Sequence, residues 1–185
     1  MPAFYLTLVA VLLAGIGARD QVTVAGLALR QGQRPAILVV ALMTTAGTAV
    51  LAGYAAWFML KQLPPPARTI FAAIALGMAG VESLVLAPRR NPREPTHSLG
   101  ALLLVLLAHQ ITDSVRFVIF GMGVGLAGPI PAAAAGLLGG SLLVGFGWLR
   151  PDLPGMPVAR RVRRLIGLAL ALVALVIFLR EVRIV

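Results

Sequence analysis

Long apolar stretches alternate along the chain with short segments rich in arginine, proline and glycine. An α-helix needs about 20 apolar residues to cross a hydrocarbon core of about 30 Å, and the stretches are close to that length. The pattern therefore predicts an all-α integral membrane protein with about six transmembrane helices. The predicted helices cover residues 3–18, 37–60, 69–87, 98–124, 132–149 and 165–179.

Polar residues interrupt two of these stretches. The first interruption follows residue 18 and consists of Arg19, Asp20, Gln21 and Thr23, after which apolar character resumes at residues 24–29. Irregular backbone at membrane depth is tolerated only where protein encloses it or where it lines a cavity. We therefore expect the first helix to be pinched at this point, with its polar groups facing the interior.

The second interruption lies inside the stretch 98–124 and gathers four polar side chains. At the helical spacings i, i+3, i+4 and i+7, one face would carry His109, Thr112, Asp113 and Arg116. Ionisable groups at that depth are costly unless they face the bundle interior, so they indicate a functional site. His109 is a candidate for proton transfer, although a histidine on an apolar helix is more often a hydrogen-bonded interior residue.

The charged residues of the spans are expected to pair with one another. Asp20, Glu82 and Asp113 are the candidate acids for ion or proton transport, and Arg19 and Arg116 are their expected partners. Unpaired charges at that depth would be too costly. We predict that Asp20 or Asp113 lies within salt-bridge distance of Arg19 or Arg116, whereas Glu82 could also extend toward the membrane surface.

Composition supports the membrane class and excludes several others. The chain has 185 residues, of which 59% are hydrophobic and 12% charged, with a mean hydropathy of +0.96. A soluble domain of this size could not bury so much apolar surface. The chain has no cysteine, which excludes disulfides and thiolate metal sites. The net charge of +10 comes from arginines between the spans, so it predicts topology rather than nucleic-acid binding.

The basic residues divide unequally between the two ends of the predicted helices. One end carries Arg30, Arg34, Arg89, Arg90, Arg93, Arg150, Arg160, Arg161, Arg163 and Arg164, and the other carries Lys61, Arg68, Arg180 and Arg183. The richer end is expected to be cytoplasmic. This places both termini outside, in a plasma membrane such as the bacterial inner membrane.

A short internal repeat divides the chain into two halves. The sequence Leu-Leu-Ala at residues 12–14 returns at 106–108, each time before a polar break and a turn with glycine or proline. The predicted halves are residues 1–87 and 98–185, joined by a basic cytoplasmic linker at 88–97. Each half holds three spans, so the two would cross the membrane in opposite senses, as in many secondary transporters.

At its two breaks the chain resembles the small manganese/calcium:proton antiporters of bacterial inner membranes, Golgi and chloroplast. Each repeat of that family carries the motif Glu-x-Gly-Asp-(Lys/Arg)-(Ser/Thr) near the end of a leading apolar run. The first copy here is residues 15–21, which keeps the glycine at Gly17 and the basic residue at Arg19. Gly15 and Ala18 stand where the family has its glutamate and aspartate.

The second copy is residues 110–114. It keeps the aspartate at Asp113 and has Gln110 in place of the glutamate, while a shift of one residue would put His109 there instead. The resemblance covers the layout of nearly the whole chain.

The resemblance implies a proton-coupled exchanger of divalent cations, with manganese or calcium as the transported ion and no permanently bound cofactor. Asp113 would be the main carboxylate ligand, Thr112 and Gln110 would add neutral oxygens, and His109 or Asp20 would exchange the proton. Divalent cations prefer several hard oxygen ligands, usually with more than one carboxylate.

Two alternatives follow from the same residues. The acids at the two breaks, Asp20 and Asp113, are matched by Arg19 and Arg116, which would suit a non-transporting scaffold or interaction protein descended from the family. An intramembrane hydrolase would need a nucleophile and a base in one cavity, but Ser114 lies on a different helical face from His109. We therefore do not expect an enzyme.

The expected partners are the lipid bilayer, a small inorganic cation and protons. Gly136 and Gly140 form a GxxxG pair in the fifth span, and such pairs let helices approach closely. They predict a homodimer through that face of the helix.

Overall fold

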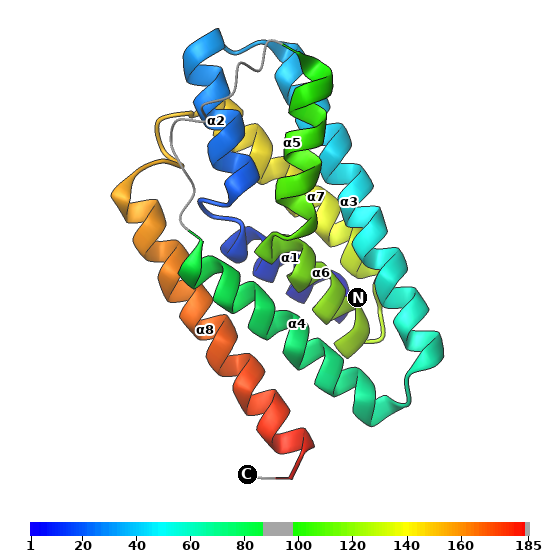
Figure 1. Cartoon of the computed structure of the whole chain (residues 1–185). Helices are drawn as coiled ribbons and strands as arrows, with labels where there is room; N and C mark the ends of the chain where they lie inside the picture. The colour runs from blue at the N-terminus through cyan, green and yellow to red at the C-terminus, as the bar shows by residue number, and fades with distance from the viewer. Residues whose placement is uncertain (87–97, 184–185) are drawn as a thin grey trace.

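The computed structural model describes residues 1–86 and 98–183 and, within them, contains only α-helices as regular secondary structure (Figure 1). The predicted all-α class is therefore confirmed. The predicted linker 88–97 and the last residue of the third predicted span lie outside the described residues. The helices are α1 (Pro2–Ala14), α2 (Arg19–Gln31), α3 (Pro35–Gln62), α4 (Pro65–Val85), α5 (Leu99–Ile111), α6 (Ser114–Gly125), α7 (Pro129–Leu149) and α8 (Pro157–Glu181).

Both polar interruptions are breaks between helices. The axes of α1 and α2 differ by 54°, and those of α5 and α6 by 50°. At the first break Gly17 has a φ of +68°, a left-handed conformation that glycine adopts without a Cβ penalty. At the second, Asp113 leaves the helix and caps α6 by accepting a hydrogen bond from the Val115 amide at 3.4 Å. The prediction of one continuous helix through residues 98–124 is therefore wrong.

Proline sets the starts of the four long helices. Pro35, Pro65, Pro129 and Pro157 each occupy the first helical position, where a missing amide hydrogen costs nothing. These helices begin two to eight residues before the predicted apolar spans. The largest difference is in α8, because its basic first turns are helical rather than part of a loop.

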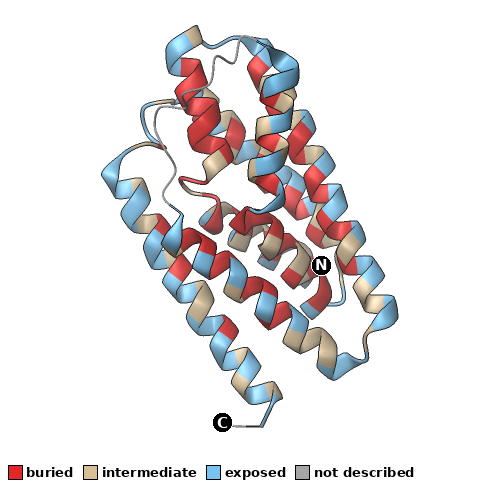
Figure 2. Ribbon diagram, in the orientation of Figure 1, coloured by how far each residue is buried: buried red, intermediate tan, exposed pale blue. Residues whose placement is uncertain are grey.

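Helices α3, α4, α7 and α8 are the long helices; α1 and α6 lie among them, whereas α2 and α5 lie toward the top of the view (Figure 1). Helix α3 packs against α7, and α4 packs against α8 and α6. Both α1 and α2 pack on α7, while α5 and α6 pack on α3. Buried positions concentrate around the two breaks, whereas α8 is largely exposed (Figure 2).

Length and composition allow four to six of these units to cross a membrane. Helices α3, α4, α7 and α8 are each long and apolar enough, and each bent pair, α1 with α2 and α5 with α6, passes the same criterion as one broken span. The outer surface carries many exposed large apolar side chains, as expected of helices in contact with lipid. The fold is that of a polytopic α-helical membrane protein.

The glycines predicted to form a dimer face the interior of the chain. A Cβ atom at Gly136 would collide with the Ile119 side chain of α6, and one at Gly140 would lie 2.8 Å from Cγ2 of Thr45 in α3. Both glycines are buried. The GxxxG face therefore packs α7 against α6 and α3 of the same chain and is not available to a second copy.

Candidate functional site

The two helix breaks meet in the middle of the molecule and bring two helix N-termini together. Ser114, the first residue of α6, donates a hydrogen bond of 3.3 Å to the Ala14 carbonyl at the end of α1. Asp20 lies in the first turn of α2 and Asp113 caps α6, so both carboxylates lie at the positive ends of helix dipoles. Both residues are buried, Asp113 completely.

Arg116 joins the two aspartates. Its Nη1 lies 3.4 Å from Oδ2 of Asp20 and 3.8 Å from Oδ2 of Asp113. Its Nε donates to the hydroxyl of Thr48 in α3 at 2.9 Å. The predicted pairing of these charges is therefore present, with Asp113 and Arg116 related by three residues as the sequence indicated.

Arg163 joins the second break to α4. Its Nη2 lies 2.5 Å from Oε2 of Glu82 and 4.0 Å from Oδ1 of Asp113. Its Nη1 donates to the carbonyl oxygen of Gly17, in the first helix break, at 2.9 Å. Glu82 is buried within this group rather than extended to the membrane surface.

Arg19 closes the group from the other side of Glu82. Its Nε lies 3.2 Å from Oε1 of Glu82. Its Nη2 donates to the carbonyl and the hydroxyl of Thr112 at 2.7 and 2.9 Å, and to the carbonyl of His109 at 3.2 Å. The arginine of the first break thus holds the end of α5 at the second break.

These six side chains form what we call the central cluster. It contains three carboxylates and three guanidinium groups, linked by five ion pairs, so its formal charges cancel. The members are Arg19, Asp20, Glu82, Asp113, Arg116 and Arg163. Pairing at this depth is expected, because an uncompensated buried charge costs several kcal/mol.

Neutral side chains complete the cluster. Gln110 is fully buried, and its Nε2 donates to Oδ2 of Asp20 at 3.0 Å and to the Thr45 hydroxyl at 3.1 Å. Its Oε1 accepts from Thr48 at 3.0 Å. The Gln110 amide therefore bridges the acid of the first break to two threonines of α3.

The other predicted residues lie at the edge of the cluster. His109 is half-buried, with Nδ1 3.4 Å from the hydroxyl of Thr23 in α2. Thr112 is exposed and contacts Arg19. The break turns α6 away from α5, so the predicted common face of His109, Thr112, Asp113 and Arg116 does not form.

Several cluster atoms retain free hydrogen-bonding capacity within the part of the chain that the structure describes. Glu82 Oε1 and Asp113 Oδ1 accept no hydrogen bond, and Arg116 Nη2 and Arg163 Nε donate none. Glu82 Oε1 still has Arg19 Nε as an ion-pair neighbour, although the two atoms make no hydrogen bond. Buried groups of this kind are rare, and they indicate a place where a small ligand or a rearrangement would find partners.

Metal-binding geometry is not preformed. Among residues 1–86 and 98–183, no group of three or more His, Cys, Asp or Glu side chains could hold a metal ion. Of the three ligands implied by the resemblance, Asp113 and Gln110 belong to the buried centre, whereas Thr112 is at its edge. The guanidinium groups occupy the positions beside the carboxylates that a bound cation would need.

Arg163 is the member of the cluster that the sequence pattern assigned elsewhere. The sequence pattern places Arg163 among the arginines of the predicted cytoplasmic end. In the structure its side chain is only 2% exposed. The signal that identifies it is helical spacing, because Arg163, Gly167 and Ala174 are the buried positions of α8 and Arg160, Arg161 and Arg164 are exposed. Thr45 and Thr48 of α3 also bind the cluster, through Gln110.

In comparisons with protein-family models, with curated proteins and with solved structures, no match to this chain is found. The class of the protein therefore follows from its fold and site. It is a polytopic α-helical membrane protein with a buried cluster of ion pairs where two broken helices meet.

Proposed function

We propose that the protein is a secondary transporter that exchanges a divalent cation, manganese or calcium, for protons at the junction of its broken helices. The observation that carries this proposal is the meeting of two helix breaks around three buried carboxylates. Discontinuous helices that meet inside a bundle are the usual site architecture of secondary transporters. The proposal agrees with the family resemblance at both breaks.

The order of elements supports two inverted repeats. Each half of the chain consists of a bent pair followed by two long helices. Each bent pair packs on the first long helix of the other half, α1 and α2 on α7 and α5 and α6 on α3. Under this proposal the halves rock about the central cluster, and the arginine-rich ends face the cytoplasm of an inner membrane with both termini outside.

The arginines set the condition for cation binding. A guanidinium group stays protonated, so a divalent cation can reach the carboxylates only if an arginine turns away from them. Asp113 and Glu82 would then be released by Arg163, and Asp20 by Arg116, with the Gln110 oxygen as a neutral ligand. Protons would replace the cation on the carboxylates in the opposite half of the cycle, with His109 at the edge of the path.

A second candidate is a non-transporting scaffold, and the charge balance of the central cluster favours it. Three carboxylates already have three guanidinium partners. In that role the cluster fixes how the broken helices pack. A scaffold would neither bind nor move a divalent cation.

Flux through purified protein in liposomes separates the two candidates. With manganese or calcium outside and a pH gradient imposed, an exchanger takes up the cation while the luminal pH changes reciprocally. Asp113→Asn should abolish this flux, whereas Glu181→Gln, which removes an acid outside the central cluster, should leave it unchanged. Absence of flux together with no protection by either cation against thermal unfolding would leave the scaffold, because a ligand that binds the folded state raises its stability.

A further inference from the structure

Four oxygen atoms surround one edge of the Arg19 guanidinium group. The carbonyl and hydroxyl oxygens of Thr112 lie 2.7 and 2.9 Å from Nη2, and the carbonyl oxygen of His109 lies 3.2 Å from the same nitrogen. Oε1 of Glu82 lies 3.2 Å from Nε. Because Nε and Nη2 belong to one small planar group, the four oxygens lie around one small volume. We call these four oxygens the Arg19 cage.

The cage attracts positive charge through the end of a broken helix as well as through a carboxylate. His109 lies in the last turn of α5 and Thr112 is its C-cap, so both carbonyls belong to the negative end of the helix dipole. In transporters with broken helices, carbonyl oxygens at such ends bind sodium ions or protons. In this structure the cation that they hold is Arg19.

Arg19 does not satisfy the carboxylate of the cage. Glu82 is buried, and its Oε2 pairs with Arg163. Its Oε1 accepts no hydrogen bond from the described residues, and Nε of Arg19 donates none. Buried polar atoms without a partner are rare and need an explanation. A metal ion, which has no N–H direction to satisfy, can contact Oε1 and the other three oxygens together.

Arg19 is also the arginine of the central cluster that can leave most easily. Its side chain is 19% exposed, compared with 5% for Arg116 and 2% for Arg163. Thr112 is exposed as well. The cage therefore lies at the edge of the central cluster, and an ion can replace Arg19 there without displacing the two buried arginines.

Charge selects the kind of ion. The central cluster has three acids and three arginines, so departure of Arg19 leaves one negative charge. A singly charged cation restores the balance, whereas a divalent cation leaves a positive charge in a low-dielectric interior. A proton on Glu82 also restores the balance, but it leaves the α5 carbonyls without a partner.

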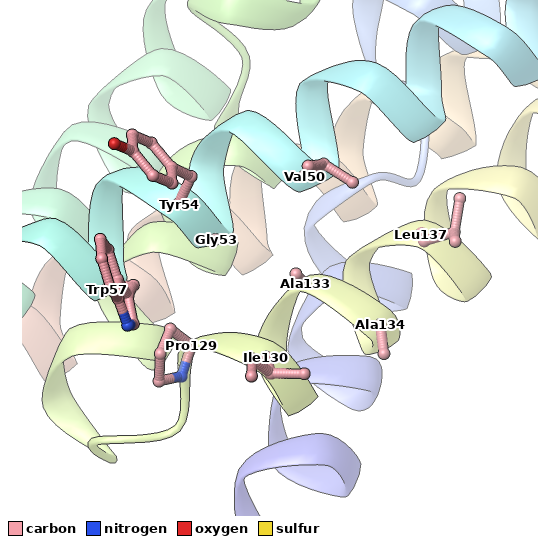
Figure 3. A pocket seen from close by; sticks show the side chains of 9 residues that line it. All are labelled: Val50, Gly53, Tyr54, Trp57, Pro129, Ile130, Ala133, Ala134 and Leu137. Atoms are coloured by element: carbon pink, nitrogen blue, oxygen red, sulfur yellow. The ribbon is translucent and has the colours of Figure 1, made fainter.

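The apolar groove between α3 and α7 lacks these properties (Figure 3). Its volume is about 410 Å³, and it is lined by apolar and aromatic side chains that include Tyr54, Trp57 and Leu137. None of the described residues that line it is charged. A cation that entered this groove would lose its hydration without gaining oxygen ligands in exchange.

We propose that the Arg19 cage is a binding site for a monovalent cation such as sodium, and that Arg19 fills it as a tethered competitor in this state. The site does not depend on exchange of a divalent cation for protons. It is tested with sodium alone, so its failure is distinguishable from a failure of manganese or calcium flux.

Binding of radioactive sodium to the purified full-length protein, with N-methylglucamine as the bulky replacement cation at equal ionic strength, tests the site. Arg19→Ala removes the competitor, and Glu82 keeps Arg163 as its partner. The variant should bind sodium at least about tenfold more tightly than the unaltered protein, as expected if Arg19 fills the cage for more than about nine-tenths of the time. Sodium should also raise its midpoint of thermal unfolding. Arg161→Ala, which removes an exposed arginine of α8, should leave sodium binding unchanged.

Thr112→Val tests the same site without altering any of the six charges, so it serves even if Arg19→Ala does not fold. It removes one oxygen of the cage and should weaken sodium binding by at least about tenfold, as changes around metal sites commonly do. Equal behaviour of Arg19→Ala in sodium and in N-methylglucamine would overturn the proposal. Stabilisation of that variant by acid but not by sodium would overturn it as well, because a proton on Glu82 would then replace Arg19.

Discussion

Arg163 extends from the first turns of α8 to Glu82, to Asp113 and to the carbonyl oxygen of Gly17. These partners belong to α4, to the second helix break and to the first. One side chain thus ties the peripheral pair of helices, α4 and α8, to both broken helices. Its aliphatic and guanidinium groups are almost completely buried, so no solvent is available to replace these contacts.

Removal of Arg163 should be strongly destabilising. Arg163→Gln leaves Glu82 with only the partly exposed Arg19 as an ion partner, and breaking a buried pair from one side costs roughly 3–5 kcal/mol. The double variant Arg163→Gln/Glu82→Gln removes both charges and should recover most of the loss. Thermal unfolding in detergent measures both effects.

Arg164→Gln is the matched control, because Arg164 is exposed one position further along α8. Its midpoint of unfolding should stay close to that of the unaltered protein. If Arg163→Gln and Arg164→Gln unfolded at the same temperature, the ion pair with Glu82 would have no structural role.

The sequence predicted some members of the central cluster and not others for a physical reason. Asp113 and Arg116 are three residues apart, so their pairing follows from local geometry once the segment is assigned to the membrane. Arg163 pairs with residues 50 and 81 positions away, and its burial depends on how α8 packs. Hydropathy alone therefore placed it with its exposed neighbours.

At the scale of elements, α4 and α8 approach unusually closely at one point. A Cβ atom at Gly80 would lie 2.7 Å from the backbone of α8, at the Ala171 nitrogen and the Gly167 oxygen. One at Gly167 would lie 2.8 Å from Cβ of Ser83. Gly80 lies about half a turn along α4 from Glu82, and Gly167 lies about one turn along α8 from Arg163. The close contact therefore sets the distance between the two helices near this ion pair.

Gly80→Ala should therefore separate α4 from α8. The added methyl group meets backbone, which cannot move aside like a flexible side chain, and overpacking of this kind costs roughly 1–3 kcal/mol. The shift also lengthens the contact between Arg163 and Glu82. We expect a lower midpoint of thermal unfolding in detergent.

Gly145→Ala in α7 is the control, since nothing lies within 4 Å of the Cβ atom that it adds. This change should be neutral or stabilising by up to about 1 kcal/mol, because alanine favours the helix over glycine. Equal destabilisation by the two substitutions would show that the close approach of α4 and α8 is not what Gly80 provides.

The element-scale predictions from sequence were right about the apolar helices and wrong about what some of them contact. Helix positions follow from apolar length and from proline at the first turn, which are local properties. The small residues at Gly136 and Gly140 correctly indicate a close helix contact, but a sequence does not say whether the neighbour is in the same chain. The bend at Asp113 was not predicted, because the four polar residues of that break also fit one continuous helical face.

At the scale of the whole molecule, the bent pairs decide how the chain crosses a membrane. The four long helices are each a candidate span. Each bent pair is either one further span, which gives six in all, or a loop that returns to the side it entered from. These two arrangements place different turns and termini on the same side of the membrane. If both pairs cross, the N-terminus, the α3–α4 turn, the α6–α7 turn and the C-terminus all lie on one side.

The positions of these segments in the fold favour six crossings. In Figure 1 the N-terminus lies right of centre, next to the α6–α7 turn, and the α3–α4 turn lies below them at the lower right, while the α2–α3 turn lies at the top. The side with fewer basic residues would then be outside. A returning α1–α2 pair would instead put the N-terminus with the α2–α3 turn.

Cysteine labelling tests this arrangement directly, because the natural chain has no cysteine to remove. Single cysteines inserted after Met1, or introduced as Gln62→Cys and Leu126→Cys, should react in intact cells with a membrane-impermeant maleimide. Gln33→Cys and Leu153→Cys should react only after the membrane is permeabilised, since they lie at the arginine-rich end. Protection of the cysteine after Met1 would make α1 and α2 a returning loop, and protection at residue 126 would do the same for α5 and α6. Either result would break the inverted arrangement, because the half that contains the returning loop would then cross the membrane twice instead of three times. The transporter proposal would lose its architectural basis.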